Sequence, residues 1–572
     1  MTDFRIEYVP FREEDVRIFG TADEWHQNWP VVYVLDDQRR VYVGETVSAT
    51  SRLRQHLANP KKRDFKSARI ILDDTFNKSA CLDLESFLIN AFAGDGQLQV
   101  TNKSASAVDR NYYDRPRYRS AFEDIFEELR ARGLFQRTLP EIRNSDFFKL
   151  SPFKALNTDQ AVAMEGILDT LFEELRAGVG STLVVQGDPG TGKTIVALSL
   201  LKLLEDIKQA SPDDALDADT MFSDFFQEGF VELMRGRSVG LVIPQQSLRA
   251  SVKRVFKKVD GLSPAIVLSP FEVGLSPTDF DVLIVDEAHR LSRRAIQSSG
   301  FDNKRFTTIN VSLYGDDDPS HTQLDWIRSK SRHQVLLIDT AQRVRPGDIG
   351  AEHLDSLISE ARRSHRHFPL ASQMRVMGGE DYIEYVRAVL AGKQNAPRQF
   401  GDYELRFFDD LSVMRSEILG READVALARL VAGYAWKWKS SSDRAAFDIE
   451  LDGLRLRWNT EVIDWINSPR SIEEVGSIHT VQGYDLNYAG VIIGPDLRYS
   501  PETGRLYVDR SSYHDRRGKV NLPKLGITIS DDDLLEYIRG IYFVLLTRGM
   551  RGTYVYVVDP HLREYLRPFF GG

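Results

Sequence analysis

Two short runs of residues, far apart in the chain, have the types and spacing that phosphate chemistry needs. In the first, VVQGDPGTGKT, Gly187 is followed after four residues by Gly192, Lys193 and Thr194. Glycines at this spacing let backbone N–H groups close around phosphate oxygens, the lysine reaches the β- and γ-phosphates, and the threonine hydroxyl binds Mg²⁺. We therefore predict a P-loop that binds ATP through the whole run: Gly187, Asp188, Pro189, Gly190, Thr191, Gly192, Lys193 and Thr194.

The second run, DVLIVDEAHRL, is an apolar stretch that ends in Asp286 and Glu287. A carboxylate at the end of a buried strand beside a P-loop holds Mg²⁺, and the next carboxylate can orient the attacking water. We predict that Asp286 and Thr194 bind one Mg²⁺ and that Glu287 serves hydrolysis. ATP binding and hydrolysis follow from the two runs together.

A third set of chemical groups lies near the N-terminus, in VVYVLDDQRRVYVGETVSATSRLRQHL. Two apolar runs separated by a turn predict a hairpin, and if Leu35 faces Tyr42, then Tyr33 and Tyr42 share one face of the sheet. Arg52 and His56 are four residues apart and share one face of the helix that follows. The four side chains can converge on a phosphodiester, although an ordinary hairpin and basic surface helix have the same pattern.

The rest of the sequence predicts the elements that must hold these residues. Residues 1–118 have the pattern of a small mixed α/β domain, and residues 119–150 that of a helical connector. From residue 151 onward, short β-rich apolar runs alternate with helical segments, which is typical of parallel sheets covered by helices on both faces. We predict an α/β fold with further domains at residues 151–360 and 361–572.

Composition limits the classes of protein that fit. With 572 residues the chain is too long for one core, and 42% hydrophobic with 28% charged residues is typical of a globular protein. No apolar run is long enough to cross a membrane, and the N-terminus lacks a secretory signal pattern. The single cysteine, Cys81, can form no internal disulfide, so we expect a buried thiol and a cytoplasmic protein.

The net charge of −10 excludes a protein coated in positive charge, but nucleic-acid binding depends on local patches. Residues 39–69 contain nine basic and two acidic residues, so a local basic patch is expected there. A solvated basic face accounts for the same composition.

The motifs downstream of the P-loop resemble those of superfamily 1 helicases, and among them the Schlafen-type helicase domains of bacteria. The resemblance implies two RecA-like motor domains, with Gln160 of LNTDQ reading adenine and VIPQQSL contacting a nucleic-acid strand. It implies that Arg375 and Arg548 reach the γ-phosphate from the second motor domain, and it gives a lesser case for Arg551. Further family positions that couple ATP to the nucleic-acid site are Asp339, Gln342, His479, Thr480, Gln482 and Gly483. One departure is Ile338 before Asp339, where the family commonly has glycine.

The N-terminal domain resembles the GIY-YIG endonucleases. Val31-Val32-Tyr33 stands for GIY and Tyr42-Val43-Gly44 for YIG, with Arg52 and His56 at the family's spacing. The resemblance implies that Glu85 of LDLESFLINAF holds a second Mg²⁺ and that Asn102 orders the site. It also implies that Arg52 binds a phosphate oxygen. Tyr33, Tyr42 and His56 remain alternatives for the group that deprotonates water.

Together these features predict an ATP-dependent nucleic-acid translocase or helicase with a metal-dependent endonuclease domain. The nuclease resemblance favours DNA as the partner, while the motor resemblance leaves RNA open and nothing indicates oligomeric state. Two alternatives stand: a nucleotide-gated switch ATPase that controls the nuclease, and a motor whose N-terminal domain binds DNA without cutting. The pairing of domains suggests defence against foreign DNA or DNA processing.

Overall fold

The structure is a computed structural model of the chain. It describes residues 4–103, 109, 111–210, 222–294, 300–339, 346–393, 396–461, 464–481, 484–515, 517–521, 523, 526 and 528–571. The chain forms two compact units. The first comprises Met1–Phe172, Ile195–Val239 and Ser251–Ile266, and the second comprises Glu173–Thr194, Gly240–Ala250 and Val267–Gly572.

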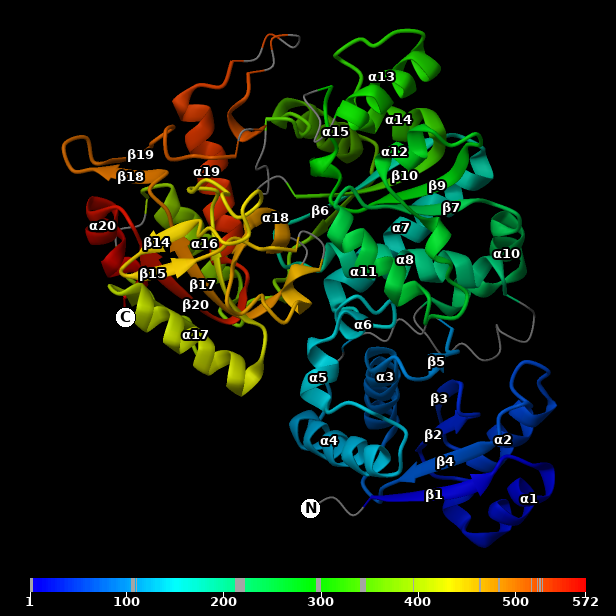
Figure 1. Ribbon diagram of the computed structural model, residues 1–572. Coiled ribbons are helices and arrows are strands. Elements are labelled where there is room, and N and C mark those ends of the chain that lie inside the picture. Colours follow the sequence, from blue (N-terminus) through cyan, green and yellow to red (C-terminus); the bar gives the residue numbers. More distant parts are fainter. Residues whose placement is uncertain are drawn as a thin grey trace. The chain divides into compact units, whose positions relative to one another are not determined.

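A five-stranded sheet, drawn in blue in Figure 1, begins the first unit. Its strand order is β1-β4-β2-β3-β5, and every pairing is antiparallel except that of β3 with β5. The strands are β1 (Arg5–Pro10), β2 (Val31–Asp36), β3 (Arg40–Thr46), β4 (Ser67–Leu72) and β5 (Gln99–Val100). β2 is buried along its whole length, which explains its continuous apolar run.

Helices pack on this sheet and position the N-terminal candidate residues. Apolar side chains of α1 (Glu13–Ala22) and α2 (Ala49–Ala58) join those of β2 and β4 in one core. α3 (Lys78–Asp95) contacts β3. It begins where the Asn77 side chain accepts a hydrogen bond from Ala80 N, and it ends at Gly96, whose φ of 67° favours glycine.

The predicted connector contains three helices. They are α4 (Arg115–Ala131), α5 (Leu139–Asn144) and α6 (Asp146–Lys149). Thr138 and Glu141 form a reciprocal capping box at the start of α5. The segment is thus helical, and its role as a connector between domains stays a prediction.

A six-stranded sheet follows, with strand order β11-β6-β10-β9-β7-β8. The registers of β6 with β10 and β11, and of β10 with β9, are parallel. The strands are β6 (Ser181–Gly187), β7 (Val239–Val242), β8 (Val267–Leu268), β9 (Phe280–Val285), β10 (Ser331–Ile338) and β11 (His367–Leu370). Because β11 belongs to it, this sheet continues past residue 360, where we expected the motor domains to meet. The boundaries at 118, 150 and 360 stay predictions.

Helices alternate with these strands, as the pattern predicted. They are α7 (Thr158–Ala177), α8 (Lys193–Lys208), α10 (Glu228–Met234), α11 (Gln246–Phe256), α12 (Pro270–Gly274), α13 (Gly300–Tyr314), α14 (Gln323–Lys330) and α15 (Ala351–Arg363). Within the second unit, α15 packs its apolar face on the sheet through Leu354, Leu357 and Ile358.

A second parallel sheet, of order β12-β20-β17-β13-β16, forms the C-terminal part of the second unit. Its strands are β12 (Glu404–Phe408), β13 (Ala428–Ala432), β16 (Val475–Ser477), β17 (Leu486–Ile493) and β20 (Gly549–Val557). Two hairpins lie outside it, β14 (Ile449–Leu451) with β15 (Leu454–Leu456) and β18 (Leu497–Ser500) with β19 (Arg505–Val508).

The helices of this part are α16 (Gly379–Leu390), α17 (Leu411–Val425), α18 (Ile478–Val481), α19 (Asp531–Leu546) and α20 (Pro560–Phe570). A capping box of Ser530 and Asp533 starts α19, whose buried face joins the core of the sheet. The predicted fold class, a small antiparallel α/β domain followed by two parallel motor-type sheets, is confirmed.

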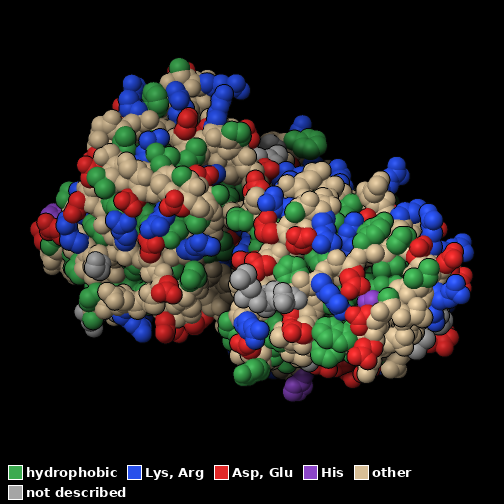
Figure 2. Space-filling model, turned by 90° about the horizontal axis from the view of Figure 1, so that it is seen from below, with side chains coloured by type: hydrophobic (Ala, Val, Ile, Leu, Met, Phe, Trp, Pro, Cys, Tyr) green, Lys and Arg blue, Asp and Glu red, His purple; other side chains and the backbone are tan. Residues whose placement is uncertain are grey.

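Among the described residues, no helix is both long and apolar enough to cross a membrane. Figure 2 shows acidic and basic side chains interspersed over the face seen from below, in keeping with a net charge of −10. Cys81 is buried and makes no disulfide, as expected.

Candidate functional site

The two tyrosines of the N-terminal hairpin lie on one face, as predicted. β2 and β3 pair with Leu35 opposite Tyr42, and the rings of Tyr33 and Tyr42 are 6.2 Å apart between centroids. Gly44 lies directly across from Tyr33, and a Cβ there would overlap the tyrosine hydroxyl. Glycine at this position is therefore required by the close approach of the phenol.

Helix α2 brings its arginine and histidine to the same phenol. Tyr33 Oη lies 2.7 Å from His56 Nε2, and Arg52 Nε donates to Tyr33 Oη at 3.4 Å. The His56 ring also meets the ring of Tyr42 edge-on, with centroids 5.3 Å apart. The structure thus brings together Tyr33, Tyr42, Arg52 and His56, which we call the tyrosine cluster.

Burial fixes the protonation of this cluster. Tyr33 has no exposed surface and His56 has 1%. Burial raises the pKa of Tyr33 well above its ordinary value, with Tyr42 adding to the rise and Arg52 opposing it. Burial, together with the charges of Lys62 and Arg52, lowers the pKa of His56 to about 2. A protonated phenol and a neutral imidazole therefore share this hydrogen bond.

Glu85 on α3 is half-buried and close enough to Tyr33 for its charge to raise the pKa of the phenol. A second carboxylate, Glu45, extends from β3 and pairs with Lys78 through one oxygen. Its other oxygen is buried and has no hydrogen-bond partner among the described residues. The charges of Glu45 and Glu85 both raise the pKa of Cys81, after burial itself. Both carboxylates thus lie within electrostatic reach of one thiol, and carboxylate oxygens are ligands that Mg²⁺ takes.

Asn102 has a structural role at the edge of β3. Its Oδ1 accepts from Val43 N at 3.1 Å, and its Nδ2 donates to Val43 O at 2.7 Å. The buried amide thus continues the ladder of the sheet on the strand that bears Tyr42. This geometry agrees with the expectation that Asn102 orders the site.

The P-loop joins β6 to α8, the context that the pattern requires. Gly190 and Gly192 have φ of 89° and 80°, in the region that favours glycine. Lys193 Nζ donates to Gly187 O at 2.8 Å and Asp188 O at 2.9 Å. The loop therefore has the backbone geometry of a phosphate cradle.

Lys193 also pairs with Asp339, whose Oδ2 lies 3.0 Å away. Asp339 is fully buried at the end of β10, and its backbone N–H donates to His289 Nδ1 at 3.1 Å. The isoleucine that precedes Asp339, where the helicase family commonly has glycine, does not prevent this contact. Asp339 thus connects the P-loop lysine to the end of β10.

Asp286 and Thr194 form the other side of the ATP site. Thr194 Oγ1 donates to Asp286 Oδ2 at 2.8 Å, so hydroxyl and carboxylate stand side by side as Mg²⁺ ligands would. Burial and the neighbouring Glu287 raise the pKa of Asp286. Burial acts in the same direction on Glu287, but His289, 3.0 Å away, and Arg290 hold the pKa of Glu287 well below its ordinary value. A charged Glu287 beside a buried metal-ligand pair suits the activation of water.

Arg375 and Arg548 lie near these groups within the second unit. Arg375 Nε donates to Asp485 Oδ1 at 2.5 Å. Arg548 is buried and donates to Tyr484 O at 3.2 Å, while its Nε has no hydrogen-bond partner among the described residues. Burial and the Arg375 charge lower the pKa of Arg548 to about 9, although the Glu287 charge opposes this shift. A buried guanidinium with spare donor capacity is suited to an incoming anion.

Other residues that the sequence singled out are less informative. Gln160 is buried at the start of α7 and exchanges hydrogen bonds with Asn157. His479 lies 3.1 Å from Asp515, and Thr480 bonds within its own turn. Arg551 is exposed. Three predicted residues lie outside the described part of the chain: Gln342, Gln482 and Gly483.

Contacts that the sequence did not indicate reach the P-loop from residues 373–387. Gln373 Nε2 donates to Pro189 O at 2.5 Å, and its Oε1 accepts from Arg375 N at 2.8 Å. Arg387 pairs with Asp188 at 3.0 Å. Gln373 lies two residues before Arg375, and this proximity was the one available signal for it. The contacts tie the P-loop to the segment that carries Arg375.

Comparison with known proteins adds a family match. Residues 180–559 match the model of the Schlafen group 3 DNA/RNA helicase domain, which confirms the expected Schlafen-type resemblance. An uncharacterized protein of Saccharomyces cerevisiae is 28% identical over 416 residues, which cover 67% of this chain and 84% of the relative.

Two solved helicase structures are also similar at a low level. The Pif1 helicase of Candida albicans covers 70% of this chain and 95% of its own, with 12% identity and a TM-score of 0.27. The Pif1 helicase from Bacteroides, in complex with ADP-AlF3 and ssDNA, covers 68% and 91%, with 10% identity and a TM-score of 0.26. Scores this low do not bear on function.

Proposed function

Because the chain belongs to the Schlafen group 3 DNA/RNA helicase-domain family, we propose that it is an ATP-driven nucleic-acid motor with a metal-dependent endonuclease domain at its N-terminus. The family assignment makes it a helicase-like P-loop NTPase. Movement along a strand and cutting are the two further steps of the proposal. DNA is the favoured substrate, with RNA as the alternative.

The motor half rests on one observation: an arginine with spare donors is buried near the candidate water-activating carboxylate. Arg548 lies within electrostatic reach of Glu287, and Arg375 lies beside it, paired with Asp485. An arginine that stabilises the charge developing on a transferred phosphoryl group accelerates hydrolysis by 10³–10⁵. Because both arginines follow the first parallel sheet in the chain, hydrolysis would depend on how the two motor sheets close, which links ATP to movement.

Thr194 and Asp286 would hold the Mg²⁺ that accompanies ATP, and this ion would neutralise phosphate charge. Lys193 would exchange its contact with Asp339 for the β- and γ-phosphates. Glu287, kept ionised by His289 and Arg290, would accept a proton from the attacking water. Gln373, bonded to Pro189 O and Arg375 N, would hold the Arg375 segment against the P-loop.

The test of the motor half is ATP hydrolysis by the full chain with and without single-stranded DNA or RNA. We expect stimulation by a strand, and Lys193→Ala should abolish both hydrolysis and strand displacement. Hydrolysis that no nucleic acid stimulates would favour the alternative of a nucleotide-gated switch. Strand displacement that survives Lys193→Ala would refute the motor.

The nuclease half rests on the hydrogen-bonded tyrosine cluster. Arg52 would bind a non-bridging phosphate oxygen through charge-assisted hydrogen bonds. Glu85, with Glu45 near it, would hold a divalent cation, which would polarise the scissile phosphate. Tyr42 is half-buried whereas Tyr33 has no exposed surface, so Tyr42 is the phenol that can meet water and substrate. Tyr33 and His56, whose rings pack against that of Tyr42, would then hold Tyr42 in position from behind.

The test of the nuclease half is Mg²⁺-dependent cutting of plasmid DNA by the wild type and by Glu85→Gln. We expect wild-type nicking that EDTA abolishes and that the variant lacks. If the wild type and Glu85→Gln bind DNA equally and the wild type does not cut it, the N-terminal domain would be a binding module. Cutting that survives Glu85→Gln would refute the site. Defence against foreign DNA and DNA processing are the two settings that suit such an enzyme.

A further inference from the structure

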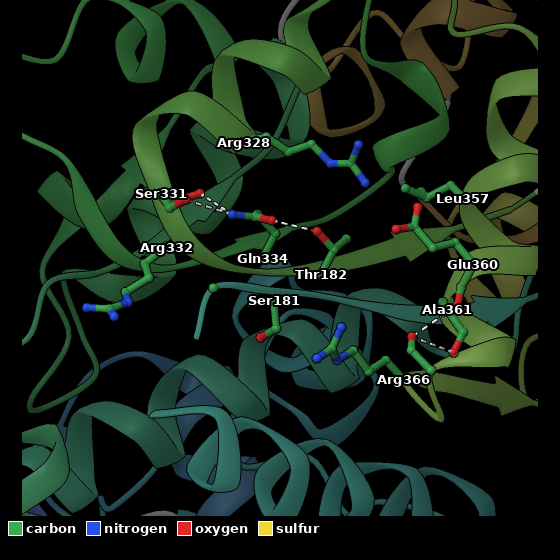
Figure 3. Close-up of a pocket in the computed structure, with 12 residues that line it drawn as sticks. Ser181, Thr182, Arg328, Ser331, Arg332, Gln334, Leu357, Glu360, Ala361 and Arg366 are labelled. Atoms are coloured by element: carbon green, nitrogen blue, oxygen red, sulfur yellow. Dashed lines mark hydrogen bonds between the residues drawn. The ribbon is translucent and has the colours of Figure 1, made fainter. Parts of the chain in front are cut away.

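A cavity of about 470 Å³ lies within the second unit at the starts of β6 and β10 (Figure 3). It is framed by Gly180–Thr182, by Arg328 to Gln334 at the junction of α14 and β10, and by the end of α15. Its volume is in the range of small-molecule sites. Parallel strands carry the P-loop at their opposite ends, so this cavity is separate from the ATP site. The five steps along the strand from Thr182 to Gly187 span about 17 Å at 3.3 Å per residue.

The floor of the cavity is polar, whereas the middle of the two strands that form it is apolar. Thr182 faces Gln334 across neighbouring strands, and its Oγ1 donates to Gln334 Oε1 at 2.7 Å. Gln334 Nε2 donates to Ser331 O at 2.8 Å and to Ser331 Oγ at 3.0 Å. Two residues further along, the same strands bury Val184 and Leu336 in the core. Three hydrogen bonds thus hold the Gln334 amide in place, and its polar atoms line the cavity.

Charged groups with unused hydrogen-bonding capacity line this space. Arg328 forms no hydrogen bond or ion pair with any residue that the structure describes, and neither does the carboxylate of Glu360. Arg366 binds Glu174 through Nε, at 2.8 Å, and through one terminal nitrogen, which leaves the other terminal nitrogen without a described partner. Figure 3 shows the Glu360 carboxylate on the side of Thr182, with the Arg328 guanidinium above Thr182 and the Arg366 guanidinium below it.

We propose that this cavity binds a small phosphate-bearing molecule. A guanidinium matches a phosphate bidentately, which Arg328 on α14 is able to do. Arg366, before β11, lines the same cavity and can add the terminal nitrogen that Glu174 does not use. Glu360 repels a bare anion but accepts hydrogen bonds from a hydroxyl or amino group beside the phosphate. The chemistry fits a phosphorylated metabolite or a mononucleotide rather than a hydrophobic ligand.

The probes are pyrophosphate and AMP, titrated calorimetrically into the full chain carrying Lys193→Ala, which removes the lysine expected to hold ATP phosphates. We expect binding to persist in this background. Arg328→Ala should weaken it about 10- to 100-fold, the usual loss for hydrogen bonds to a charged group. Glu360→Gln should strengthen pyrophosphate binding, because it removes a negative charge from the wall. A fold defect would not produce these opposite signs.

Arg332→Ala is the matched control, because Arg332 lines the same rim but points its guanidinium away, to Gly178 O. It should leave binding unchanged. Loss of all binding in Lys193→Ala, or binding that is indifferent to Arg328→Ala, would overturn the proposal. The third probe is a single-stranded oligonucleotide. If Arg328→Ala weakens binding of the oligonucleotide but not of pyrophosphate or AMP, the cavity is a nucleic-acid contact and the small-ligand proposal is wrong.

Discussion

Acidification should destabilise the N-terminal domain through His56. The imidazole has a pKa of about 2 in the folded protein, against 6.5 for an unperturbed histidine. The unfolded chain therefore binds a proton more readily than the folded one, so the stabilisation is present above pH 6.5 and is lost as the pH falls towards 2. Proton linkage over these values gives a loss of about 2 kcal/mol between pH 7 and pH 5 from this one residue.

His56→Gln isolates the effect, because the glutamine amide oxygen can accept the Tyr33 hydrogen bond but cannot be protonated in this range. Hydrogen exchange of the β2, β3 and α2 amides, corrected for intrinsic rates, measures the opening free energy at pH 7 and pH 5. The wild type should lose about 2 kcal/mol more than the variant. The exposed His561→Gln serves as a control and should behave like the wild type.

Equal pH dependence in the wild type and His56→Gln would refute this reasoning. It would mean that the histidine is not a buried neutral imidazole hydrogen-bonded to Tyr33. The assignment of Tyr33 and His56 as the groups that hold Tyr42 in position would then be wrong.

Three further predictions concern single groups. Gly44→Ala should displace the Tyr33 phenol, at a cost of about 1–3 kcal/mol in a melting experiment, and should abolish cutting; an active, equally stable variant would show that the close approach is wrong. Asp339→Ala should leave Lys193 buried without its counter-charge and destabilise the motor by about 3–5 kcal/mol in denaturant titrations, and a loss below about 1 kcal/mol would contradict the buried pair. Arg548→Ala should lower kcat for ATP hydrolysis about 10³-fold while nucleotide binding persists, whereas an unchanged kcat would remove Arg548 from the ATP site.

Local sequence rules predicted much of the site. The alternation of β2 and β3 set the hairpin register, so Tyr33 and Tyr42 share a face. The i, i+4 spacing brought Arg52 and His56 to the same phenol. The P-loop and the DEAH run each lie at the end of a buried strand, as their patterns require, because parallel strands bring their carboxyl ends to one edge of a sheet.

Long-range contacts could not be predicted in the same way. Gln373 reaches Pro189 across more than 180 residues of sequence, and nothing near either residue indicates the contact. The order β11-β6-β10-β9-β7-β8 depends on which crossovers pack best, not on local propensity. Tyr33 is fully buried whereas Tyr42 is half-buried. This difference depends on helix packing that a single sequence does not reveal.

The most direct test of the central claim is cutting of plasmid, linear and single-stranded DNA and of RNA with Mg²⁺, with and without ATP. We predict that the wild type cuts DNA, that Glu85→Gln hydrolyses ATP without cutting, and that Lys193→Ala retains ATP-independent cutting but loses any change that ATP produces. Loss of both activities in either folded variant, or no cutting of any substrate by the wild type, would contradict an endonuclease joined to a separate ATP-driven motor.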